Sequence, residues 1–201
     1  MASWFTWCAA GTAERLALYR LAMDDARNSS VEGNEDVFPN VEIAVIKDNP
    51  YVHGLWLEAL RLGTASAAAR VVMDEDAEVE GYLVKRVSVL LMPVQLMHFD
   101  ENVFPDPGEI QPERWMTTDQ GQMKRMNSTM RPFGGGTSLC SGRYVAEHEI
   151  IGVVSTLLLM FDVKFEQGSA EWEFNPRSIG VMAPKRDPTV LLRRRPANSA
   201  E

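Results

Sequence analysis

Residues 132–143 read Pro-Phe-Gly-Gly-Gly-Thr-Ser-Leu-Cys-Ser-Gly-Arg, and this stretch says most about the fold of the chain. Three consecutive glycines let the backbone adopt conformations closed to other residues, and let a large flat group approach closely. Cys140 follows them, and the apolar run over 142–160 then predicts a long helix. We therefore expect Cys140 near a helix N-terminus, where the helix dipole and unpaired N–H groups stabilise a thiolate.

Three interpretations of this loop compete. The plainest is that Cys140 is a small buried apolar residue beside a flexible glycine loop. A phosphate-binding loop is the second, but the Lys-Ser/Thr pair of such loops does not follow these glycines. The third is that the Cys140 thiolate is the axial ligand of a haem iron, a ligand that pushes electron density toward O–O cleavage.

The composition excludes several classes of protein. A chain of 201 residues with 45% hydrophobic residues suits one large domain or a large piece of one. A net charge of -8 disfavours nucleic-acid binding, and the short basic run 193–195 is better explained as a solvated chain end. The two cysteines, Cys8 and Cys140, form no C-x-x-C pair, so we expect no zinc site, no disulfide framework and a reducing compartment. We find no signal peptide and no run of about 18 apolar residues, so no membrane anchor is expected in this chain.

A second motif lies on a helix predicted over 50–62. Glu58 and Arg61 are three residues apart, so they share one helix face and can pair. An exposed ion pair is the plain alternative, and it would contribute only about 0–1 kcal/mol. The helix around the pair is apolar, with Trp56, Leu57, Leu60 and Leu62. A buried charge pair in such surroundings needs further partners.

Residues 112–115, Pro-Glu-Arg-Trp, supply a third charge. Together with the cysteine loop and the Glu58-Ala59-Leu60-Arg61 segment, they resemble the haem-binding, E-x-x-R and P-E-R-F/W motifs of the cytochrome P450 family. The resemblance covers roughly 40–195. It implies that Cys140 binds the iron of haem b. It also implies that Glu58, Arg61 and Arg114 form a structural cluster that holds the cysteine loop. Residues 58–70 and 95–107 look most like the sterol 7-hydroxylase and prostacyclin synthase branch and its fungal relatives.

The same resemblance implies which residues contact the haem: Phe133, Gly134, Gly136, Ser138, Gly142 and Arg70. The family usually has a basic residue two positions before the cysteine, where it pairs with a haem propionate. Here Ser138 offers only a hydroxyl at that position. Arg70 lies where relatives often carry a propionate-binding arginine, although a solvated strand residue is the plain alternative. His98 matches a family histidine that does no chemistry, so we expect a structural role for it rather than iron binding.

The family fold is mainly α with small antiparallel β-sheets, and the sequence pattern agrees with it. We expect helices at roughly 3–27, 50–62 and 142–160, and strands at 68–92 and 161–193. Residues 29–40 read as a polar loop, and residues 98–136 as a long connection without regular structure. In the tail, turns are expected at 167–168, 175–176 and 187–188. The resemblance makes residues 1–201 the C-terminal haem-binding part of a P450 domain, with the distal half absent.

The implied function is a haem-thiolate monooxygenase. It would insert one oxygen atom of O2 into a small apolar organic substrate of the lipid, sterol or terpenoid kind. Electrons would come from NADPH-cytochrome P450 reductase or a similar donor. Substrate contacts are expected at 65–69 and 179–182, and no catalytic residue is assigned. The full-length parent is expected at the cytoplasmic face of the endoplasmic reticulum membrane.

Two alternatives to this activity remain. The first is a haem-thiolate isomerase that acts on a peroxide without O2 or a reductase. The second is a truncated, non-catalytic remnant, because the distal wall and the oxygen-activating helix of the family lie N-terminal to the matching segment. For the same reason we expect the 201-residue chain alone to bind haem weakly.

Overall fold

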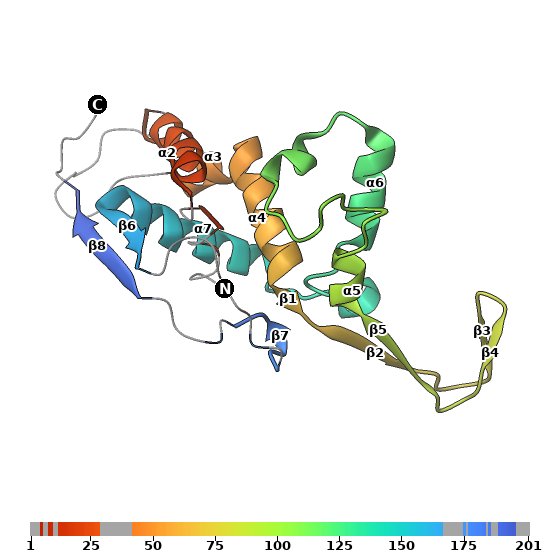
Figure 1. The fold of residues 1–201 in the computed structure, drawn as a ribbon. Coiled ribbons are helices and arrows are strands. Elements are labelled where there is room, and N and C mark those ends of the chain that lie inside the picture. Colours follow the sequence, from red (N-terminus) through yellow and green to blue (C-terminus); the bar gives the residue numbers. More distant parts are fainter. Residues whose placement is uncertain are drawn as a thin grey trace.

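The computed structural model describes residues 5, 8, 9, 12–28, 42–166, 175, 177–183, 185 and 189–195. Four helices form the body of the molecule: α2 (Ala13–Asn28), α3 (Ile43–Asp48), α4 (Pro50–Gly63) and α7 (Arg143–Met160). In Figure 1, α4 runs through the middle, with α2, α3 and α7 on one side and α5 and α6 on the other. The predicted helices at 50–62 and 142–160 are confirmed within one residue at each end.

Helix α4 begins where the sequence predicts. The Asn49 side chain accepts hydrogen bonds from the N–H groups of Tyr51 (3.0 Å) and Val52 (3.3 Å), and Pro50 occupies the first helical position. From Leu55 to Gly63 the helix is almost entirely buried, because elements pack on both of its sides. At Gly54 a Cβ atom would collide with the carbonyl oxygen of Pro112, so glycine permits the close approach of the 112–116 segment.

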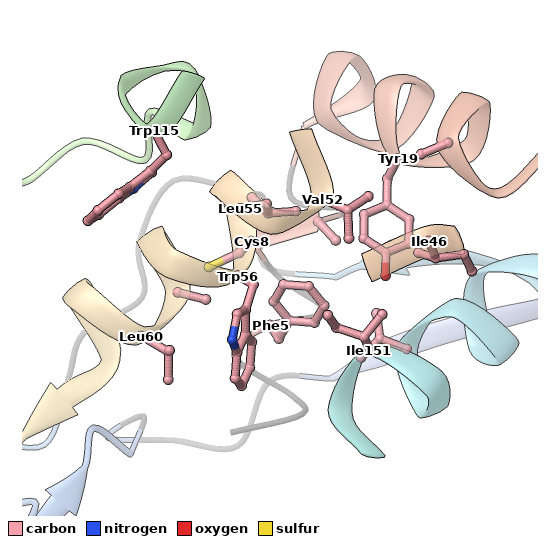
Figure 2. Packing of buried hydrophobic residues seen from close by; sticks show 14 of the residues in the cluster. Phe5, Cys8, Tyr19, Ile46, Val52, Leu55, Trp56, Leu60, Trp115 and Ile151 are labelled. Carbon is pink, nitrogen blue, oxygen red and sulfur yellow. The ribbon is translucent and has the colours of Figure 1, made fainter. Parts of the chain in front are cut away.

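The apolar core lies between α2, α3, α4 and α7 (Figure 2). The Phe5 ring meets Tyr19 and Trp56 edge to face, with ring centroids 6.1 and 5.7 Å apart. Such edge contacts are favourable for aromatic quadrupoles. The Tyr19 hydroxyl lies 2.9 Å from the Ser155 hydroxyl, which satisfies both buried groups and joins α2 to α7. Burial raises the pKa of Tyr19, so it is neutral and can donate in this pair.

The strands of the described residues form four two-stranded antiparallel ribbons. Strand β2 (Ala67–Val71) pairs with β5 (Val89–Pro93), and β3 (Ala77–Val79) pairs with β4 (Tyr82–Val84). Both ribbons extend away from the body in Figure 1, with β3 and β4 at the far end. The strands predicted over 68–92 are therefore present, as short pieces.

The C-terminal strands return to the body. Strand β6 (Phe161–Phe165) pairs with β8 (Val190–Arg194), and β1 (Thr64–Ala65) pairs with β7 (Gly180–Val181). The second pairing places the tail beside the end of α4. The predicted loop at 29–40 and the predicted turns at 167–168 and 187–188 lie outside the described residues, as does position 176 of the turn predicted at 175–176. Among the described residues, no helix is both long enough and apolar enough to cross a membrane.

The expectation that residues 98–136 lack regular structure is wrong. This region contains a 3-10 helix, η1 (Pro112–Met116), and an α-helix, α6 (Gln120–Thr129); a further short helix, α5 (Val94–His98), precedes them. Helix α6 begins at Asp119, whose carboxylate accepts from the N–H groups of Gly121 and Gln122 at 2.8 and 3.1 Å. Its apolar face consists of three methionines at positions 123, 126 and 130. The first two are three residues apart and the last two are four apart, which is helical spacing. The polar residues between them make this pattern weak in the sequence.

Candidate functional site

The cysteine loop forms a compact turn before α7. The Cys140 N–H donates to the Phe133 carbonyl at 3.0 Å, which closes the loop across its base. Gly134 (φ 79°) and Gly136 (φ 61°) both lie in the left-handed region, where residues with a Cβ are strained. Helix α7 begins at Arg143, three residues after Cys140. The structure therefore places the cysteine at the N-terminal end of a helix, as the sequence predicts.

The loop offers its thiol to an open face. Cys140 is exposed, and Phe133 is half-buried and packs against the core. A Cβ added at Gly136 would meet no atom within 4 Å, and one at Gly142 would lie 3.8 Å from the Cys140 sulfur. Neither glycine places a side chain in this space, which leaves room for a flat group to approach the loop. The plain interpretation, in which Cys140 is a buried apolar residue, does not fit this exposure.

The residues present fit a haem better than a metal ion bound by protein alone. Among the described residues, no group of three His, Cys, Asp or Glu side chains could hold a metal ion. An iron at Cys140 would have this single thiolate as its protein ligand. A porphyrin provides the further nitrogen ligands that such an iron needs.

Behind the loop, Glu58 and Arg61 form a fully buried ion pair. Both side chains are 0% exposed, and Arg61 binds the carboxylate through Nε and Nη2, each at 2.9 Å. The remaining N–H groups of Arg61 donate to the backbone carbonyls of His98 (3.0 Å), Pro107 (2.7 Å) and Glu109 (3.0 Å). All five guanidinium donors therefore have acceptors, the condition under which a buried charge is tolerated.

The Glu58 carboxylate accepts from η1 as well as from α4. The Trp115 indole N–H donates to Oε1 at 2.9 Å, and the Gln111 backbone N–H donates to Oε2 at 3.0 Å. These two donors were missed by reasoning from the sequence. The tryptophan next to Arg114 was a possible signal, because a buried indole usually needs an acceptor.

Arg114 also belongs to the cluster, but fewer of its N–H groups have acceptors than those of Arg61. Its Nε lies 3.2 Å from Glu58 Oε1 in an ion pair, and Nη1 donates to the Pro105 carbonyl at 2.9 Å. The side chain is 4% exposed, yet Nε and Nη2 have no hydrogen-bond partner among the described residues. Burial lowers the pKa of Arg114, and the Arg61 charge lowers it further, while Glu58 opposes both effects.

His98 connects the buried cluster to the cysteine loop. Its Nε2 accepts from the Arg131 backbone N–H at 3.0 Å, so the proton of the neutral ring is on Nδ1. Nδ1 then donates to the Arg61 carbonyl at 3.1 Å. Burial lowers the pKa of His98 to about 4, so the ring is neutral at pH 7. With both nitrogens bonded to backbone, His98 is in a structural position, as the sequence predicts.

The other two predicted haem contacts, Arg70 and Ser138, are both exposed. Arg70 on β2 is exposed; its Nη1 donates to the Ala69 carbonyl at 2.8 Å, and its Nη2 lies 3.5 Å from the Gly135 carbonyl. Ser138 is exposed at the end of a short 3-10 helix, η2 (Gly136–Ser138). The structure thus brings Arg70 to the cysteine loop from a strand 65 residues away.

The family model and the relatives that match this chain all point to the same family. The family model described as "Cytochrome P450" matches residues 22–192. Cytochrome P450 monooxygenase poxD of Penicillium oxalicum is 34% identical over 72% of this chain and 30% of its own length. Cytochrome P450 7A1 of Rattus norvegicus is 25% identical over 71% of this chain and 31% of its own length. The relatives thus include fungal, plant and animal cytochromes P450.

A solved structure supports the fold. A cytochrome P450 named CYP102L1 superposes with a TM-score of 0.77 at 24% identity, and the match covers 96% of this chain and 41% of that one. This confirms the predicted fold class, mainly helical with small antiparallel sheets. The chain spans about a third of the length of the curated relatives it matches, such as the two above.

Proposed function

Because this chain belongs to the cytochrome P450 family, we propose that it is the haem-binding C-terminal part of a monooxygenase in which Cys140 is the iron ligand. The observation that carries the proposal is the exposed thiol at the start of α7, on a glycine loop closed by the bond from Cys140 to Phe133. A thiolate in this position benefits from the helix N-terminus. The buried cluster around Glu58 keeps the loop in place from behind, through His98 and Arg131.

In this proposal the bound haem b supplies the activation of O2, and the chain supplies the ligand and the shape of the site. Cys140 binds the iron, and Gly134, Gly136 and Gly142 leave room for the porphyrin. Phe133 packs beside it. Arg70 and Ser138 bind a propionate, with Arg70 as the charged partner because Ser138 offers only a hydroxyl.

The substrate in this proposal is a small apolar organic molecule of the lipid, sterol or terpenoid kind. The pairing of β1 with β7 supports it, because this pairing brings residues 64–65 against residues 180–181. Ile179 beside this pair is 93% exposed, and Val181 is also exposed. Apolar side chains at such a position favour an apolar ligand over a charged one.

For the whole protein we propose electron supply by NADPH-cytochrome P450 reductase or a similar donor, and a location on the cytoplasmic face of the endoplasmic reticulum. The test uses the longest natural protein that contains this chain, incubated with O2, a reductase and an apolar substrate library. The proposal predicts that product formation requires both NADPH and the reductase. Turnover of a peroxide that needs neither would identify an isomerase instead, and haem binding without any turnover would identify a remnant.

Haem titration of the 201-residue chain alone tests whether this part of the fold can hold haem without the distal half. A haem held on one face is open to water, and thiolate ligation depends on a shielded site. We expect weak binding. Tight stoichiometric binding that keeps thiolate ligation after reduction would show that this chain needs no distal half to hold its cofactor.

A further inference from the structure

The first two residues of α7 lie against the cysteine loop. Arg143 Nη1 donates to the Cys140 carbonyl at 2.9 Å. The same guanidinium stacks on the Tyr144 ring, with Cζ 4.2 Å from the ring centroid, and Nη2 donates to the Tyr144 hydroxyl at 3.1 Å. Arg143 is therefore held from two sides, by the backbone of Cys140 and by its own neighbour.

This contact ties α7 to the loop at a helix start that no side chain caps. The N-cap residue of α7 is Gly142, which makes no side-chain hydrogen bond, and the first turn contains no acidic residue. The start of the helix is thus fastened to the loop by a cation that acts on the carbonyl group of Cys140. An added Cβ at Gly142 would lie 3.8 Å from the Cys140 sulfur, so the segment that Arg143 fastens also passes close beside the thiol.

We propose that Arg143 is a positioning residue for Cys140 and that Tyr144 holds Arg143 in place. The hydrogen bond fixes the peptide that follows Cys140, and the positive charge lies beside the ligand residue. Reduction of a haem iron adds one negative charge next to this cation, so Arg143 favours the reduced state. The inference rests on the proposed function, because it takes Cys140 as the iron ligand.

The expected effect is modest because the guanidinium is close to solvent. Interactions of exposed charges are weak, so we expect the equilibrium between reduced and oxidised haem to change by about threefold. The charge and the hydrogen bond can be separated by three substitutions. Arg143→Lys keeps the charge, Arg143→Gln keeps a neutral donor, and Arg143→Leu removes both.

The experiment measures the ratio of reduced to oxidised haem at a fixed electrode potential, in the longest natural protein that contains this chain. We expect Arg143→Leu and Arg143→Gln to lower this ratio about threefold, and Arg143→Lys to keep it near wild type. Tyr144→Leu should shift the ratio in the same direction, because it frees Arg143, whereas Tyr144→Phe keeps the stacking and shifts it less. Arg194→Leu on β8 is the matched control, since it removes the same charge from an exposed strand away from the loop.

Two failures are distinguishable. A wild-type protein without a thiolate-ligated haem would overturn the proposed function itself. A wild-type protein with thiolate-ligated haem, but with an unchanged ratio in both Arg143→Leu and Arg143→Gln, would overturn the role of Arg143 alone. If Arg143→Leu fails to fold, Arg143→Gln and Arg143→Lys still decide the question, because both keep a hydrogen-bond donor at this position.

Discussion

The buried cluster around Glu58 and the exposed loop around Cys140 belong to one candidate site, but they differ in how many of their polar groups find partners within the chain. Glu58 has donors from α4 and η1, and Arg61 uses all its N–H groups within the chain. Cys140 instead is exposed, on a loop where a Cβ at Gly136 would meet open space. The chain therefore completes its buried cluster by itself, and in the proposed function the exposed cysteine is completed by a bound haem. Substitutions in the cluster should therefore change stability, whereas those in the loop should change ligand binding.

The largest effect is expected from Arg61→Leu. This substitution removes the bidentate partner of the buried Glu58 carboxylate, and loss of one partner from a buried ion pair destabilises proteins by about 3–5 kcal/mol. Arg114→Leu should cost less, because two atoms of Arg114 have no hydrogen-bond partner among the described residues. Urea denaturation of the 201-residue chain measures both, with the exposed Arg125→Leu as the control. Equal midpoints for Arg61→Leu and Arg125→Leu would contradict the buried cluster.

Acid should break the link between the cluster and the loop. The pKa of His98 is about 4 in the folded chain, against about 6.5 for an ordinary histidine, so the unfolded chain binds the extra proton first as pH falls. The stability from neutral His98 is therefore complete above pH 6.5 and is lost toward pH 4, by about 3 kcal/mol in all. Urea midpoints across this range should fall more steeply for wild type than for His98→Gln, which cannot titrate. Parallel curves would show that His98 does not carry this pH dependence.

A smaller effect is expected where α4 meets η1. A Cβ at Gly54 collides with the backbone carbonyl of Pro112, so Gly54→Ala forces the two elements apart and should cost about 1–3 kcal/mol. Gly108→Ala is the matched control, because a Cβ there meets nothing within 4 Å. Thermal unfolding of the two variants checks the difference. A Gly54→Ala variant as stable as Gly108→Ala would contradict the close packing.

The smallest effect on stability belongs to the loop itself. Cys140→Ser should change the unfolding free energy of the 201-residue chain by less than about 0.5 kcal/mol, because the side chain is exposed. Cys8→Ser places a hydroxyl in a fully buried position and should cost about 1–3 kcal/mol. Alkylation of the native chain followed by mass spectrometry gives a second check. It should label Cys140 and leave Cys8 unlabelled, and the reverse pattern would contradict the structure.

The sequence predicted the parts of the site that depend on local spacing. Helix α4 had a cap, a proline and an apolar pattern, and Glu58 and Arg61 met because three residues separate them. The partners of Arg61 at His98, Pro107 and Glu109 were not predictable, because backbone carbonyls carry no side-chain signal. Helix α6 was missed because its polar composition outweighed its spaced methionines. The bond from Arg131 to His98 depends on the path of the chain over 33 residues, which no local pattern specifies.

The most direct test of the central claim is the spectrum of the reduced carbon monoxide complex. It should be recorded for the longest natural protein that contains this chain, as wild type and as Cys140→His. If Cys140 is the iron ligand, wild type shows a long-wavelength Soret band, typical of thiolate ligation, and Cys140→His loses it. Persistence of the band in Cys140→His would show that Cys140 is not the iron ligand.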